Sequence, residues 1–118
     1  KKGGMMRNSL GGENEKGVWG KQADWLDYSR VVGGTRHGIL LVPHRDNPRR
    51  SYFHARDYGM MTANPFGTKS FTNEGDGSFK LTAGKTLRLR FGLFAYAGEI
   101  DPATIEKEYH TTADATSR

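Results

Sequence analysis

Residues 86–93 read TLRLRFGL, and this stretch decides the fold class. Apolar side chains occupy every second position, from Leu87 to Leu93, and polar residues or glycine stand between them. A period of two is typical of a half-buried β-strand. Upstream, residues 78–82 read as a shorter strand, and Ala83-Gly84-Lys85 reads as a tight turn. The two runs predict a hairpin.

The same period continues towards the N-terminus. Residues 21–32 and 35–42 are extended runs on either side of Gly33-Gly34, and this pair supplies the positive φ that two-residue hairpin turns need. A third extended run covers residues 51–57. The chain is therefore predicted to be mainly β, an antiparallel β-sandwich or the C-terminal part of one, over residues 18–113.

One helix is predicted near the C-terminus. Asp101 can cap it, Pro102 suits its first position, and Ile105 and Tyr109 are four residues apart on one face. Residues 114–118 are predicted to be a disordered tail.

Residues 1–17 read KKGGMMRNSLGGENEKG, a Gly-rich segment without a period that predicts irregular structure. The chain begins at Lys1, so we expect a C-terminal fragment whose partner is the N-terminal remainder of the same domain. Hydrophobic residues make up only 35%, and mean hydropathy is −0.74, which limits the core that this piece can build.

Composition excludes several classes of function. The longest apolar run, residues 39–43, is far shorter than a spanning helix, so no membrane insertion is predicted. With no cysteine there are no disulfides or thiolate ligands. The net charge is +5, but cations are scattered among acids and Arg49-Arg50 is the longest basic block, so no nucleic-acid partner is predicted. The compartment and any cofactor stay unassigned.

The candidate site is the polar stretch of residues 43–67. His44 and His54 lie ten residues apart at the end of one predicted strand and inside the next, so adjacent strands could bring them together as catalytic residues. They could also hold a metal ion, with a third ligand from Asp27, Asp46, Asp57 or His37. The alternative is that each histidine is satisfied by local structural contacts.

Further ligand-binding candidates surround the histidines. Arg56 and Tyr58 share a strand face with His54, an aromatic and cationic surface that suits a hydroxylated or carboxylated ligand; the alternative is a solvated outer face. Asn47 and Asn64 can present amides to a ligand, although Asn64 also suits a structural role in its turn.

Two more candidates come from an earlier strand. Trp25 offers a stacking surface, and Asp27 shares its face, so an apolar wall could make this carboxyl group a general acid or base. The alternative is an exposed aspartate at a sheet edge. Gly-x-Ser-x-Gly, His-Glu-x-x-His and phosphate-loop motifs do not occur.

Over residues 18–112 the ordered set of motifs resembles a bacterial family labelled "methane oxygenase PmoA". The motifs are residues 23–28, His44-x-x-Asn47-Pro48, His54-x-Arg56-Asp57-Tyr58-Gly59 and residues 63–67. The label implies a copper membrane oxygenase, yet the chain has no apolar run that could form such a subunit's spanning helices. The resemblance instead implies a soluble, sometimes exported β-sandwich protein of carbohydrate metabolism, in which His44, Asn47, His54, Arg56, Tyr58 and Asn64 match the family motif.

The leading hypothesis is a protein that binds or processes a carbohydrate or related polyhydroxy compound. Two alternatives stay open: a metal-dependent oxygenase or hydrolase that uses His44 and His54, and a non-catalytic glycan-recognition module.

Overall fold

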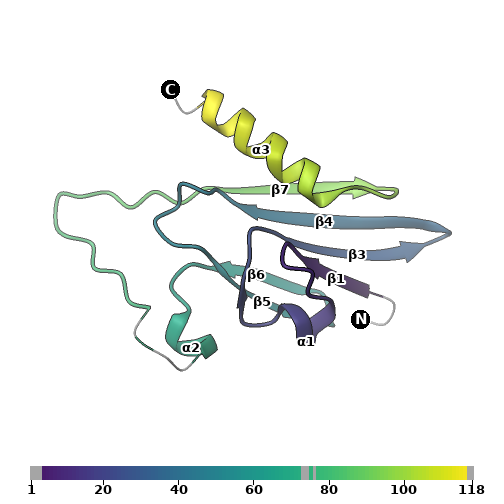
Figure 1. The fold of residues 1–118 in the computed structure, drawn as a ribbon, viewed down its shortest axis with the longest axis horizontal. Helices are drawn as coiled ribbons and strands as arrows, with labels where there is room; N and C mark the ends of the chain where they lie inside the picture. The colour runs from purple at the N-terminus through teal and green to yellow at the C-terminus, as the bar shows by residue number, and fades with distance from the viewer. Residues whose placement is uncertain (1–3, 73–74, 76, 117–118) are drawn as a thin grey trace.

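The computed structural model describes residues 4–72, 75 and 77–116, which form two antiparallel sheets and a long C-terminal helix (Figure 1). The larger sheet has the order β1-β3-β4-β7, and the smaller has the order β2-β5-β6. The strands are β1 (Gly4–Asn8), β2 (Lys21–Gln22), β3 (Leu26–Val32), β4 (Thr35–Pro43), β5 (Tyr52–Arg56), β6 (Met60–Asn64) and β7 (Phe91–Ala97). The helices are α1 (Asn14–Val18), α2 (Thr68–Thr72) and α3 (Pro102–Thr116). The predicted mainly β class with a C-terminal helix is confirmed.

The hairpin of β3 and β4 forms the centre of the larger sheet. Gly33 and Gly34 connect the strands with φ of 59° and 83°, the backbone of a tight primed turn. The prediction of a hairpin here is confirmed, but its first strand begins at Leu26 and not at Lys21. Residues 23–25 carry the chain from one sheet to the other, since β2 pairs with β5 while β3 pairs with β4.

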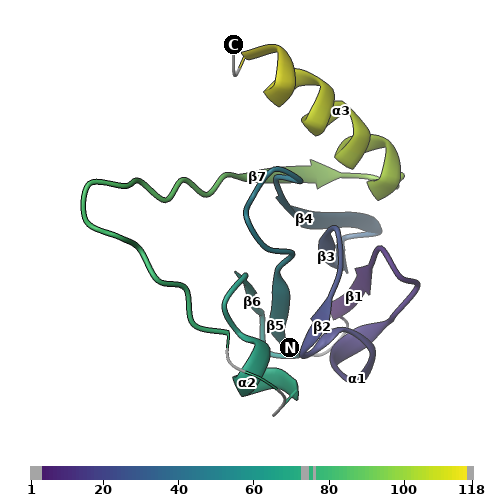
Figure 2. The ribbon, with the colours of Figure 1, turned by 60° about the vertical axis from the view of Figure 1, so that its left-hand side comes forward.

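The two sheets face each other across an apolar core. Met6 of β1 and Leu26 of β3 pack against Phe53 and Ala55 of β5, and all four are buried. The opposite face of the larger sheet carries a second buried cluster, formed by Trp25, Leu40 and Val42, on which Ile105 and Tyr109 of α3 pack. The larger sheet is thus covered by a sheet on one side and by α3 on the other (Figures 1 and 2).

The N-terminal segment is more ordered than its composition predicts. Within residues 4–17, β1 pairs with β3 along its whole length and α1 begins at Asn14. The prediction of irregular structure over residues 1–17 is therefore wrong for this part, because the buried side chain of Met6 anchors the strand. Residues 1–3 lie outside the described part.

The predicted hairpin of residues 78–82 with 86–93 does not form. Residues 77–90, here called the excursion, contain a turn in which the amide of Lys85 donates to the carbonyl of Thr82, but no strand, and project away from both sheets (Figure 2). The strand begins only at Phe91, where it pairs with Pro43 of β4. Beyond Pro43 the chain leaves the sheet, so the residues before Phe91 have no neighbouring strand in the described structure.

Helix α3 begins as predicted and ends later than predicted. The carboxylate of Asp101 accepts hydrogen bonds from the amide of Ala103 and the hydroxyl of Thr104, which caps the first turn. The helix continues to Thr116, so the tail predicted from residue 114 is helical as far as the structure describes it. Asp114 holds this last turn through an ion pair with Arg45. In the described residues no helix combines the length and the apolar character needed to cross a membrane.

Candidate functional site

A polar cavity of about 420 Å³ lies where the β4–β5 loop meets α3. Its volume falls within the range of small-molecule sites, about 300–1,000 Å³. The loop contributes most of the wall, and α3 contributes Glu106 and His110. The lining residues are Ala23, Asp24, Pro43, His44, Arg45, Asn47, Arg49, Arg50, Ser51, Glu106 and His110.

His44 is fixed in the cavity wall by its own loop. Its side chain is fully buried, and its Nδ1 accepts a hydrogen bond of 3.0 Å from the backbone amide of Asp46. A nitrogen that accepts from an amide carries no proton, so this geometry assigns the proton of the neutral ring to Nε2. His44 is therefore held as a hydrogen-bond donor.

Three of the residues that line the cavity each carry a buried polar atom with no hydrogen-bond partner in the described protein. These atoms are Nε2 of His44, Oγ of Ser51 and Nδ1 of His110. The nearest carboxylate to His44 Nε2 is Asp114, whose Oδ1 is 3.7 Å away, beyond hydrogen-bond distance. Buried polar groups are nearly always paired, so three such atoms around one cavity indicate a site for a polar molecule.

Glu106 and His110 form the helical side of the site. They are one turn apart on α3, and His110 Nε2 lies 3.7 Å from the carboxylate of Glu106. Burial, and then the charge of Asp24, raise the pKa of Glu106. Burial, and then the positive charge of Arg45, lower the pKa of His110. The pKa of Glu106 is raised and that of His110 is lowered, so the difference in proton affinity between the two groups is smaller than in water.

The lowered pKa of His110 predicts a pH dependence of stability. The unfolded chain binds the proton more readily than the folded protein, so the free energy of unfolding should fall as pH decreases from 6.5 towards the lowered pKa of His110. The variant His110→Gln should lose this part of the slope in denaturant titrations across the pH range.

Glu106 has the opposite effect on stability. Its pKa is raised, so the folded protein binds this proton more tightly than the unfolded chain does. The resulting stabilisation is present at low pH and is lost as pH rises through the raised pKa. Glu106→Gln is therefore the control, and it should leave the slope due to His110 in place. Wild-type and His110→Gln slopes that coincide below pH 6.5 would contradict the assignment.

The rim of the cavity is a set of ion pairs. Arg45 pairs with Asp114 of α3, and Arg50 Nη2 lies 3.0 Å from the carboxylate of Asp24. Arg49 also lines the cavity, and its guanidinium donates to the carbonyl groups of Gly77 and Ser78 at the base of the excursion. The opening is thus polar and carries both signs of charge.

Asn47 lines the cavity, but its amide has structural partners. Its Nδ2 donates to the carbonyl of Arg90, and its Oδ1 accepts from the amide of the same residue, at 2.9 and 2.8 Å. The side chain thus takes the place of a strand next to Arg90. This contact accounts for the amide without a ligand.

His54 does not share the cavity with His44. It lies on the outer face of the smaller sheet, where its ring contacts Trp19 and Phe71 and its Nε2 accepts from Arg56. The prediction that both imidazoles face one cleft is therefore wrong. His44 follows β4 of the larger sheet and His54 lies in β5 of the smaller sheet, so proximity in sequence did not bring the rings together.

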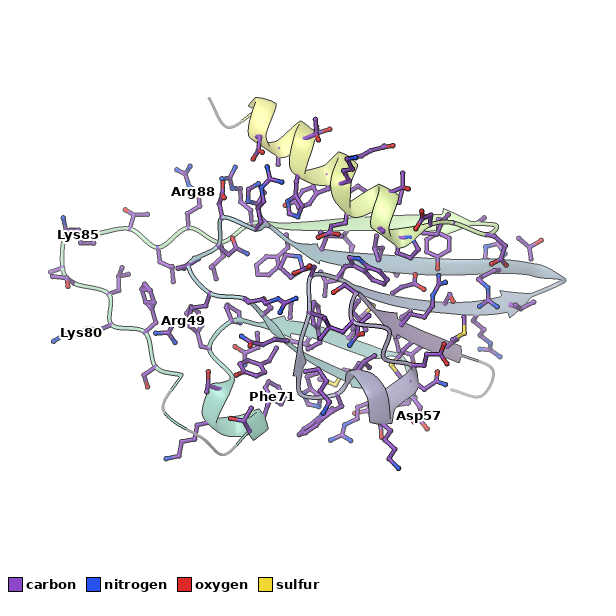
Figure 3. All side chains as sticks on the ribbon, in the orientation of Figure 1. Arg49, Asp57, Phe71, Lys80, Lys85 and Arg88 are labelled. Atoms are coloured by element: carbon purple, nitrogen blue, oxygen red, sulfur yellow. The ribbon has the colours of Figure 1, made fainter. Side chains whose placement is uncertain are left out.

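Arg56 belongs to the same outer cluster as His54. Its guanidinium lies over the ring of Trp19, 5.3 Å from the centroid, and 3.6 Å from the carboxylate of Glu15. Phe71 of α2, labelled in Figure 3, completes the cluster through its ring contact with Trp19. This surface is a small packed layer under α2, separate from the cavity.

Tyr58 and Asn64 also lie away from the cavity. Tyr58 is 65% exposed in the turn after β5, and its hydroxyl donates to the sulfur of Met60. Oδ1 of Asn64 accepts from the amide of Phe66, which holds the turn after β6. Asn64 therefore has the structural role that its turn sequence offered.

Trp25 and Asp27 are buried on the face of the larger sheet that α3 covers. Trp25 belongs to the apolar cluster beneath α3, so its ring is not available for stacking on a ligand. Both oxygens of Asp27 have partners: Oδ1 accepts from the hydroxyl of Tyr96, and Oδ2 accepts from Arg7 at 3.0 Å. Asp27 is a buried structural anion, and neither predicted possibility, a general acid or an exposed edge residue, describes it.

A group of possible metal ligands lies beside the cavity. Ligand atoms of His44, Asp46 and Asp114 lie within 4.8 Å of one another. The imidazole does not fit this role, because coordination through Nε2 would require the proton on Nδ1, where the Asp46 amide already donates. Asp114 is moreover paired with Arg45. The donor set therefore favours hydrogen bonding over metal binding.

Sequence reasoning missed Ser51, Glu106 and His110. The signal was present for two of them, because Glu106 and His110 are spaced four apart, one position beyond Ile105 and Tyr109 on the same helix. Ser51 carried no such signal, since a single serine at the start of a strand is ordinary.

Fold and cavity together define a two-sheet β protein with a small polar pocket between an inter-sheet loop and a C-terminal helix. The sequence model of the family of unknown function DUF6807 matches residues 1–110, and the chain belongs to this family. Searches of curated proteins and of solved structures found no match.

Proposed function

We propose that the protein binds a carbohydrate or related polyhydroxy compound in the cavity between the β4–β5 loop and α3. The observation that carries this proposal is the set of three unpartnered buried atoms, on His44, Ser51 and His110, around one cavity. A ring of hydroxyl groups both donates and accepts, so one such ligand can pair with all three atoms. The carbohydrate class itself comes from the resemblance in sequence to the PmoA-labelled family.

The chemistry of each wall supports the same ligand class. Nε2–H of His44 requires an acceptor, whereas Ser51 can donate or accept. Glu106 and His110 line the same cavity one helical turn apart and can move a proton to or from a bound hydroxyl group. This pair supports processing of the ligand as well as binding.

The decisive experiment compares two histidines of the same chain. His44→Gln should weaken binding of a monosaccharide about tenfold, the effect of losing one buried hydrogen bond and its geometry. His54→Gln is the matched control and should leave the affinity unchanged, because His54 lies outside the cavity. Binding is measured by ligand-observed NMR against a panel of neutral and acidic monosaccharides.

Ser51→Ala gives an independent check, since it removes one unpartnered oxygen and little volume. It should also weaken binding of the sugar that the panel identifies. The proposal fails if the panel gives no binding, or if His54→Gln weakens binding as much as His44→Gln while both variants keep the wild-type melting temperature.

A further inference from the structure

The larger sheet turns one face, here called the inner face, towards the smaller sheet. The smaller sheet covers this face at β1 and β3 but not at β7. Cross-strand neighbours share a face, and the row through Leu26, Leu41 and Leu93 runs from β3 across β4 to β7. Leu26 is fully buried, Leu41 is partly buried and Leu93 is 68% exposed. Burial is lost along the row because the smaller sheet does not reach β7.

The neighbouring residues repeat this loss of cover. Phe91 and Ile39 are each 40% exposed, and both are large apolar side chains at the β7 end of the sheet. β7 is an edge strand, and within the described residues no other strand pairs with its outer side. An exposed apolar edge of this kind is a template for strand addition.

The excursion extends the same edge. Residues 86–90 keep the alternation of a strand, with Leu87 and Leu89 in step with Phe91 and Leu93, yet they form no ladder in the described structure. The sequence therefore continues the pattern of β7 upstream of the residues that pair with another strand in the described structure. A groove of about 500 Å³ runs beside it, between Leu89 and Phe91 on one side and Tyr109 of α3 on the other.

Charge indicates what kind of strand fits. Residues 77–98 contain four cations and no acidic residue. Figure 3 shows Lys80, Lys85 and Arg88 spaced along the excursion, with Arg49 at its base. Arg88 alternates with the leucines, so a strand laid against this edge meets apolar side chains on one face and a positive charge on the other.

A second copy of the chain does not satisfy this pattern. Antiparallel pairing of two copies centred on Leu89 keeps the leucines of both copies on one face, but it places Arg88 of one copy opposite Arg90 of the other, and opposed like charges destabilise a sheet. We propose that the β7 edge and residues 86–90 bind an extended segment of a partner polypeptide in which apolar residues alternate with acidic residues.

The test uses short blocked peptides as probes, one of alternating glutamate and valine and one of alternating lysine and valine. The glutamate peptide should bind about tenfold tighter, since each opposite-charge pair across strands adds a fraction of a kcal/mol. It should also slow hydrogen exchange of amides within residues 86–93.

Charge reversal makes the test specific. Arg88→Glu should remove most of the preference for the glutamate peptide, because the new carboxylate offsets the charge of Arg90 on the same face. Arg88 is exposed, so folding is not at risk. Lys69→Glu on α2 is the matched control and should change nothing, because Lys69 lies outside the edge. The proposal is overturned by equal affinity for both peptides, by no protection of residues 86–93, or by self-association that protects these amides without peptide.

Discussion

The variant Asp27→Asn is expected to lower the free energy of unfolding by about 3 kcal/mol, towards the lower end of what breaking a buried ion pair costs. Asp27 is fully buried, and its two oxygens accept from Tyr96 on one side and Arg7 on the other. An amide would leave the guanidinium of Arg7 without its counter-charge. The cost is limited because Arg7 is still partly exposed to water.

The matched control is Glu99→Gln, which makes the same chemical change in an exposed pair. The side chain of Glu99 is 82% exposed, and it lies 3.2 Å from Arg36. Exposed pairs contribute about 0–1 kcal/mol, so this variant should be nearly as stable as the wild type in urea titrations. Equal losses for the two variants would show that the Asp27 network is not the stabilising element described here.

The second large effect is expected for Trp25→Ala, which should cost about 3–5 kcal/mol because a large buried ring is removed. Trp25 packs with Leu40 and Val42 under Ile105 and Tyr109, so its loss removes the surface on which α3 lies. Hydrogen exchange of α3 amides should rise. Sugar binding should also fall, since α3 carries Glu106 and His110 into the cavity.

The other tryptophan serves as the control. Trp19 packs against His54 and Phe71 on the outer face of the smaller sheet and makes no contact with α3 among the described interactions. Trp19→Ala should therefore leave hydrogen exchange in α3 and sugar binding unchanged. A Trp25→Ala protein with normal exchange in α3 would contradict the role assigned to this residue.

Local signals in the sequence predicted much of the fold. The Gly33-Gly34 turn, the extended run at residues 51–57 and the Asp101-Pro102 helix start each depend on neighbouring residues alone, and each is present. Residues 86–90 have the alternation of a strand but do not form one. A strand also needs a neighbouring strand to pair with, and local sequence does not show whether one is present. β1 was missed because one buried methionine, Met6, outweighs the glycines around it.

Only part of the candidate site could be predicted from the sequence. His44 stands in the cavity, whereas His54, its predicted partner, is separated by the division of strands between two sheets. The true neighbour is His110, 66 positions further along the chain than His44, whose ring centroid lies 5.3 Å from that of His44. Such a long-range contact depends on how α3 packs over the sheet, and no local pattern specifies that packing.

The hydrogen bonds of Asn47 and Arg49 have a mechanical consequence. Asn47 is hydrogen-bonded to the backbone at residue 90, and Arg49 to the backbone at residues 77 and 78. One short loop therefore fixes both ends of the excursion. The two ends of the excursion are thus held close together. The entropic cost of closing this loop is therefore already part of the folding free energy. The same loop lines the cavity, so its side chains connect the cavity wall to both ends of the excursion.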